Sequence, residues 1–118
     1  MTIDKPEAAA DDKPILIYAT VPGIETAEAL AAALVDRRMV ACANIIPGMV
    51  SIYEWKGTRQ RDAEVVMLLK TRRGLMEAVI ATIEAEHPYE TPAIIAVDVC
   101  GGSLQFFSWI LAQTRAIA

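Results

Sequence analysis

The feature that most constrains this chain is that its strand-like segments are hydrophobic on both faces. Successive side chains of a β-strand point to opposite faces of the sheet. In the segment 62–71 both sets are apolar, with Val65, Met67 and Leu69 on one face and Val66 and Leu68 on the other. Segments 15–21 and 94–100 have the same character, which is usual for a sheet that is covered on both sides. A stable fold therefore needs cover for two faces.

The helices that the sequence predicts are too few to provide that cover. A first helix is expected from Glu25 to the basic pair at 37–38, where cations suit the helix dipole. A second is expected to start at Thr71 as its N-cap and to end near His87-Pro88, because the residue before a proline avoids helical geometry. A third is expected over residues 103–115, after the break at the glycine pair before it.

The remaining apolar segments predict a long hairpin. Residues 43–56 form one arm, interrupted at Pro47-Gly48, where a bulge or bend would re-aim the strand. Gly57 and the polar run 58–62 are expected to form the turn into the next strand. With a last strand over 93–100, the order is βαββαβ followed by one more helix.

This order predicts an α+β protein with a ferredoxin-like fold, an additional C-terminal helix and an antiparallel sheet. Right-handed crossovers place both connecting helices on the same face of such a sheet. The opposite face, with its share of Ile, Val and Leu, is then bare in a single molecule. We expect further copies of the chain to cover it, so the sequence predicts a homo-oligomer.

Composition limits the class of protein. The length of 118 residues suits one domain, which is expected over 14–116. Residues 1–13 are acidic and rich in alanine, so we expect a disordered tail and not a secretory signal. The hydrophobic content of 54% supports burial between subunits, but no apolar stretch reaches the roughly 20 residues of a membrane span. A net charge of −4 leaves no basic surface for nucleic acid, and two cysteines without export features fit the cytoplasm.

Several motifs occur in an order that points to a known family. They are the segments 39–48 and 51–57, then Glu64 and Lys70-Thr71, and above all His87-Pro88-Tyr89-Glu90-Thr91-Pro92. Over about residues 14–112 the chain resembles the CutA divalent-cation tolerance proteins. The resemblance implies a stable homotrimer, similar in architecture to the PII signalling trimers. It also implies a non-enzymatic role in the response to copper and other divalent metal ions, and no established reaction comes with it.

Four residues are candidate metal ligands. His87 is the only histidine, and Glu90 adds an oxygen donor three residues later. Cys42 offers a sulfur ligand for copper, and Glu64 offers a carboxylate from the hairpin. Each of His87 and Cys42 also has a purely structural alternative, as a packed core or subunit contact. Some family members carry a copper-binding cysteine at the position of Ala19, so that ligand is absent from this chain.

The leading reading is a divalent-ion response, either by weak metal binding or by relaying a signal to a protein partner. The alternative is a PII-like sensor that binds an anionic small molecule between subunits, with Tyr53, Trp55 and Lys70 lining the cleft. An enzyme is not favoured, because the single histidine has no nucleophile partner at a motif spacing.

Overall fold

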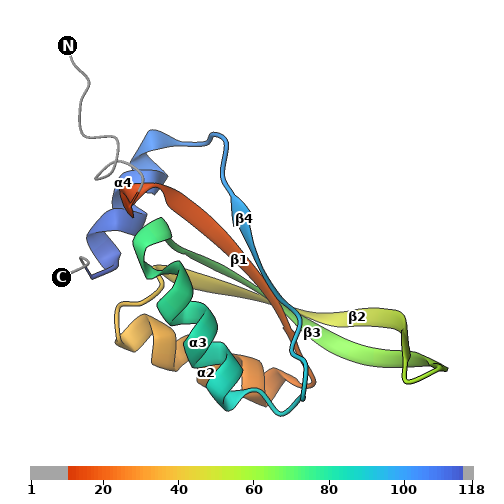
Figure 1. Cartoon of the computed structure of the whole chain (residues 1–118). Helices are drawn as coiled ribbons and strands as arrows, with labels where there is room; N and C mark the ends of the chain where they lie inside the picture. Colours follow the sequence, from red (N-terminus) through yellow and green to blue (C-terminus); the bar gives the residue numbers. More distant parts are fainter. Residues whose placement is uncertain (1–10, 116–118) are drawn as a thin grey trace.

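The computed structural model describes residues 11–115 and consists of one antiparallel sheet with helices on it (Figure 1). Along the chain the elements are β1 (Pro14–Val21), α2 (Ile24–Asp36), β2 (Cys42–Trp55), β3 (Thr58–Arg72), the 3-10 turn η1 (Arg73–Leu75), α3 (Met76–Glu86), β4 (Ile94–Asp98) and α4 (Leu104–Gln113). The four strands lie in the order β2-β3-β1-β4. This confirms the predicted α+β, ferredoxin-like arrangement with its additional C-terminal helix.

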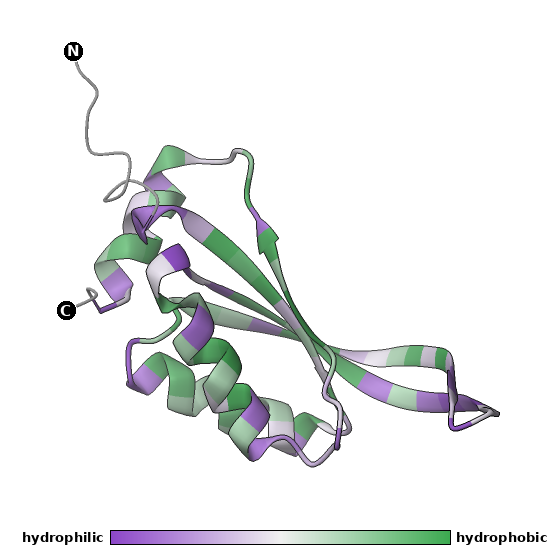
Figure 2. Ribbon diagram, in the orientation of Figure 1, coloured by the Kyte–Doolittle hydropathy of each residue, from purple (hydrophilic) through white to green (hydrophobic). Residues whose placement is uncertain are grey.

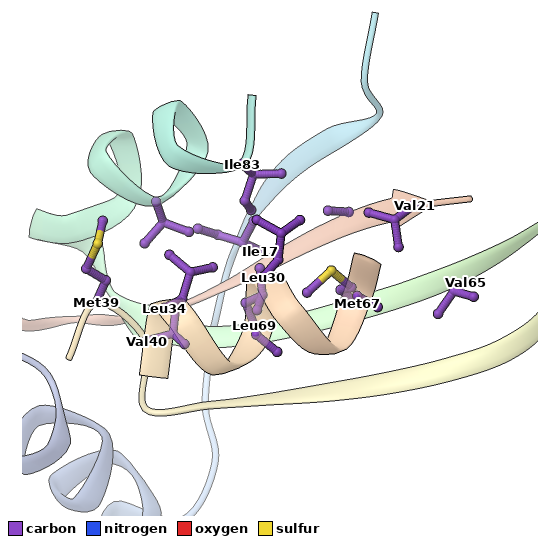
Figure 3. Close-up of a cluster of buried hydrophobic side chains, with 14 of the residues drawn as sticks. Ile17, Val21, Leu30, Leu34, Met39, Val40, Val65, Met67, Leu69 and Ile83 are labelled. Atoms are coloured by element: carbon purple, nitrogen blue, oxygen red, sulfur yellow. The ribbon is translucent and has the colours of Figure 1, made fainter. Parts of the chain in front are cut away.

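One face of the sheet is covered by α2 and α3, which lie together on the same side of it (Figure 1). Residues at alternate positions of β1 and β3 point into this layer, and Ile17, Met67 and Leu69 have no exposed surface. Leu34 of α2 and Ile83 of α3 are equally buried against them (Figure 3). Burial of such side chains contributes about 1.5–3 kcal/mol each, so this layer is the hydrophobic core.

The other face of the sheet, called here the open face, carries the remaining alternate residues. Tyr18 of β1 lies opposite Leu68 of β3 and Ile95 of β4, and cross-strand partners share a face. Ile95 and Val97 are 57% and 44% exposed, and Figure 2 shows most of β1 and β4 as hydrophobic. Among the described elements, α4 packs near this face, at the end of the sheet where β1 begins (Figure 1). The prediction of one bare, apolar sheet face is confirmed.

The hairpin of β2 and β3 extends well beyond the helices (Figure 1), and a bulge lies within it. Ile46 pairs with Val66 and Met49 with Glu64, so Pro47 and Gly48 together stand opposite one residue. Gly48 has a φ of +87°, a left-handed conformation that glycine adopts without strain. The extra residue reverses the alternation of β2, so the odd-numbered residues from Met49 onward lie on the open face.

Two details of the predicted elements are wrong. The polar run 58–62 is part of β3, and the hairpin turn consists of Lys56 and Gly57, whose φ values of 52° and 84° suit a two-residue turn. Thr71 does not cap α3, because it is a residue of β3 and its Oγ1 donates to the carbonyl oxygen of Met39 at 2.7 Å. The helix begins later, at Met76, after η1.

Arg72 joins both ends of the described chain at the end of β3. Its guanidinium donates to Thr114 Oγ1 at 3.0 Å and to the carbonyl oxygen of Leu111 at 2.7 Å, which fixes the end of α4. It also forms an ion pair of 2.9 Å with Asp12. Of the tail expected over 1–13, residues 1–10 lie outside the described residues. Asp12 pairs with Arg72 at the end of β3, and the carbonyl oxygen of Lys13 accepts from the backbone N–H of Arg73 in η1.

Candidate functional site

The open face is hollowed into a cleft of about 880 Å³ where the hairpin leaves the sheet. Its walls come from β1, from the arms of the hairpin and from the segment that follows α3. The lining residues are Tyr18, Thr20, Ser51, Ile52, Tyr53, Trp55, Asp62, Ala63, Glu64, Pro88, Tyr89, Glu90, Thr91 and Ala93. The bulge accounts for part of this lining, because it turns Ser51, Tyr53 and Trp55 toward the open face.

Three carboxylates line the cleft, and none of its described lining residues is basic. Glu64 is only 7% exposed and accepts a hydrogen bond of 2.6 Å from the hydroxyl of Ser51. Asp62 accepts a hydrogen bond from the phenol of Tyr53. Glu90, in the segment after α3, is exposed. The described lining of the cleft is therefore acidic.

The carboxylates contribute to raised pKa values of two tyrosines in the cleft. The hydrogen bond to Asp62, followed by partial burial and the nearby negative charge, raises the pKa of Tyr53 to about 12. Partial burial and then the charge of Glu64 raise the pKa of Tyr89 above its ordinary value. Both shifts oppose the formation of a further negative charge in the cleft.

His87 lies beneath the cleft and is 8% exposed. Its Nε2 is 2.6 Å from the carbonyl oxygen of Thr20, which requires a hydrogen on Nε2, and its Nδ1 accepts from the backbone N–H of Tyr89 at 3.1 Å. The imidazole also contacts the Tyr89 ring, with centroids 4.8 Å apart. Both ring nitrogens are thus engaged, and the visible role of His87 is to hold residues 88–90 at the rim of the cleft.

Cys42 lies apart from the cleft, at the opposite end of β2. It pairs with Lys70 of β3, whose ammonium group donates to the side chain of Asn44. Of the four predicted ligands, the structure brings Glu64 and Glu90 to one cleft, places His87 under its rim and leaves Cys42 elsewhere. Within residues 11–115, no three His, Cys, Asp or Glu side chains are grouped as a metal site.

Sequence reasoning assigned Asp62 to a turn and did not place it in the site. The signal that could have found it is the spacing of Asp62 and Glu64, which lie two residues apart and therefore share a strand face. Tyr18 was likewise missed, because its membership of the open face depends on its pairing with Leu68 and Ile95.

The family profile described as CutA1 divalent ion tolerance protein matches residues 15–113. The chain belongs to the CutA1 divalent ion tolerance family. Its relatives include the chloroplastic Protein CutA of Arabidopsis thaliana, 40% identical over 101 residues, which are 86% of this chain and 56% of that protein. They also include the divalent-cation tolerance protein CutA of Escherichia coli, 33% identical over 109 residues, or 92% of this chain and 97% of that protein.

The fold agrees with solved structures of family members. CutA from Xylella fastidiosa superimposes with a TM-score of 0.85 at 35% identity, covering 87% of this chain and 99% of that one. CutA1 from Oryza sativa gives 0.84 at 38% identity, covering 86% and 94%. The matched part of this chain covers 57% and 56% of the full-length chloroplastic proteins of Oryza sativa and Arabidopsis thaliana. It covers 97% of the Escherichia coli protein. In the part of the chain that the structure describes, no helix combines the length and apolar character of a membrane span.

Proposed function

We propose that this protein acts in tolerance of divalent cations as a non-enzymatic homotrimer. The observation that carries the proposal is the family match over residues 15–113, together with a relative in Escherichia coli that bears the name divalent-cation tolerance protein and is covered almost completely.

The trimer is supported by the apolar residues of the open face. Ile46, Ile95 and Val97 are 48%, 57% and 44% exposed in the single chain. At about 25 cal/mol per Å² of apolar surface, covering them in an assembly recovers several kcal/mol, which is a large part of the stability of a small domain. The unpaired outer edges of β2 and β4 also offer backbone groups for pairing between subunits.

Mass measurement tests the assembly directly. Light scattering after size-exclusion chromatography should give three times the chain mass at micromolar protein concentration. Ile95→Lys places a charge on the open face and should shift the protein toward monomers, whereas Ile24→Lys, on the half-exposed start of α2, should leave the trimer intact. A wild-type protein with the mass of one chain would contradict the trimer.

For the bound ion we propose copper or another divalent cation, with Glu64 and Glu90 as ligands from the cleft. Ligation by His87 requires its ring to release Thr20 or Tyr89, and Cys42 requires a second site or a neighbouring subunit. Isothermal titration with Cu²⁺ and Zn²⁺ should give saturable binding that Glu64→Gln weakens. Glu54→Gln is the matched control, since Glu54 is exposed on the other face of the same arm.

The cellular role is tested by growth. A strain of the source organism that lacks the gene should grow more slowly in raised Cu²⁺ or Zn²⁺, and the wild-type gene should restore growth. Equal growth of the deleted and parent strains at every concentration would contradict a role in cation tolerance. Proteins that co-purify with the tagged trimer from metal-stressed cells would identify the proposed protein partner.

The PII-like reading, with an anion in the cleft, is not favoured. Tyr53 and Trp55 line the cleft of the single chain, but its described lining supplies three carboxylates and no cation. Lys70 is instead engaged with Asn44.

We propose a cytoplasmic location, supported by Cys42 and Cys100 being free cysteines. Because relatives named chloroplastic and periplasmic exist, cell fractionation is the test.

A further inference from the structure

The C-terminal helix α4 carries an aromatic surface that the rest of the described chain leaves uncovered. Leu104 is 80% exposed, and Phe106 and Trp109 are each 42% exposed. The rings of Phe106 and Trp109 stack with centroids 5.8 Å apart, so with Leu104 they form one patch, called here the α4 patch. No residue of Leu104–Gln113 is charged. Large uncharged side chains, aromatic ones above all, are typical of the centre of a protein–protein interface.

The projecting hairpin carries a second uncovered surface, on the face opposite the open face. The alternation of β2 places Val50 and Ile52 there, and they are 45% and 67% exposed. The helices that cover this side of the sheet end before the hairpin does (Figure 1). Ile52 lies opposite Arg61 of β3, an exposed residue that takes part in neither of the two ion pairs within residues 11–115. Val50, Ile52 and Arg61 are called here the hairpin patch.

The two patches are chemically complementary. Stacked aromatic rings offer flat apolar area to a side chain such as that of Ile52, and their faces attract a guanidinium such as that of Arg61. Two hairpin patches in mutual contact would instead bring two guanidinium groups together, which is unfavourable. A two-stranded ribbon is marginally stable without a covering surface, so the hairpin needs such a partner.

The patches cannot meet within one chain. The end of α4 is fixed by Arg72, the last residue of β3. At a rise of about 3.3 Å per residue, Arg61 lies roughly 36 Å from Arg72 along that strand. The hairpin and α4 accordingly lie at opposite ends of the sheet (Figure 1). A contact between the patches is therefore a contact between different copies, and because the patches differ, it runs head to tail and can close a ring.

We propose that the hairpin patch of one copy packs on the α4 patch of the next copy, so that three head-to-tail contacts close the trimer. The inference rests on the proposed homotrimer and names a pair of surfaces, besides the open face, through which neighbouring copies hold one another. The contact uses neither Glu64 nor Glu90, so the cation site proposed above is compatible with it.

Assembly mass over a dilution series tests the contact. Trp109→Lys and Ile52→Lys should each dissociate at protein concentrations at least about ten-fold higher than the wild type does. Ile24→Lys is the matched control, since Ile24 is 38% exposed but lies at the start of α2. Arg61→Gln should also weaken assembly, whereas Arg37→Gln, at the exposed end of α2, should not. Circular dichroism checks that each variant is folded.

A mixture of two variants tests the head-to-tail order. Trp109→Lys keeps an intact hairpin patch and Ile52→Lys keeps an intact α4 patch, so each pair of unlike copies retains one complete contact. The mixture should therefore contain heavier assemblies than either variant alone at the same total concentration. A mixture no heavier than its components would overturn the inference. If Trp109→Lys fails to fold, Leu104→Lys replaces it, because Leu104 is 80% exposed.

The same measurements separate this inference from the proposed trimer. A wild-type protein with the mass of one chain at every concentration would overturn both. A trimeric wild type whose dissociation is unchanged by Ile52→Lys and by folded Trp109→Lys would overturn the head-to-tail contact alone, and would leave a trimer held by the open face.

Discussion

Replacing Arg72 by methionine should lower the free energy of unfolding by about 3–5 kcal/mol, because it removes buried hydrogen bonds from a charged donor to the end of α4. The side chain of Arg72 is 10% exposed, and it donates four hydrogen bonds, to Thr114 Oγ1, to the carbonyl oxygens of Leu111 and Thr114, and to Asp12. Methionine retains the apolar stem but no donor. The two carbonyl oxygens at the end of α4 then lose their partner.

The contributions of these bonds differ. Hydrogen bonds from a charged donor contribute about 1.5–3 kcal/mol each when buried, which applies to the bonds that fix Leu111 and Thr114. The side chain of Asp12 is 51% exposed, so its ion pair with Arg72 adds less than about 1 kcal/mol. Most of the loss should therefore appear as detachment of α4, where Ile110 is only 2% exposed.

Arg73→Met is the matched control for Arg72→Met. Arg73 is the next residue, and its one ion pair, with Asp98 at 3.1 Å, joins side chains that are 45% and 75% exposed. Its replacement should cost less than about 1 kcal/mol. Denaturant unfolding at one fixed protein concentration measures both variants, and hydrogen exchange of α4 locates the change. Equal destabilisation by the two substitutions would refute the assigned role of Arg72.

Three further predictions concern the hairpin and the core. Asp62→Asn should lower the pKa of Tyr53 from about 12 toward 10.0 in a spectrophotometric titration. The raised pKa favours the protonated phenol in the folded protein. The stabilisation by this phenol is therefore full below pH 10.0 and is lost as pH rises through about 12. Gly48→Ala should destabilise by about 1–2 kcal/mol in denaturant unfolding, because its φ of +87° is strained for alanine. Thr71→Val should cost about 1–3 kcal/mol in the same assay, because it leaves the carbonyl oxygen of Met39 without its donor.

The order of elements could be predicted because each depends on local periodicity. The bulge was also predictable, since Pro47 and Gly48 each disfavour a regular strand. The extent of the hairpin was not predictable in this way. Residues 58–62 are polar because that part of β3 projects beyond the helices and both of its faces meet solvent in the single chain, so its composition is that of a loop.

The candidate site was only partly predictable because it depends on strand register. Glu64 and Glu90 were expected as ligands, and both line the cleft. Thr71 looked like a helix cap because threonine is common there, but a buried hydrogen bond to Met39 holds it in β3. Cys42 lies apart from the cleft because residues 43–50 of β2, the bulge included, separate it from Ser51, the first residue of that strand in the cleft lining. Which residues of different strands meet at the cleft follows from the pairing between strands and cannot be read from residue spacing.

The meeting of Asp12 and Thr114 at a single guanidinium has a consequence for protein engineering. Because segments from both ends of the domain contact Arg72, a short peptide linker could join them and produce a circularly permuted chain. The exposed two-residue tip at Lys56-Gly57 is a natural place to open the new termini. A permutant cut there would retain every strand of the sheet while exchanging a local β-turn for a tethered pair of ends.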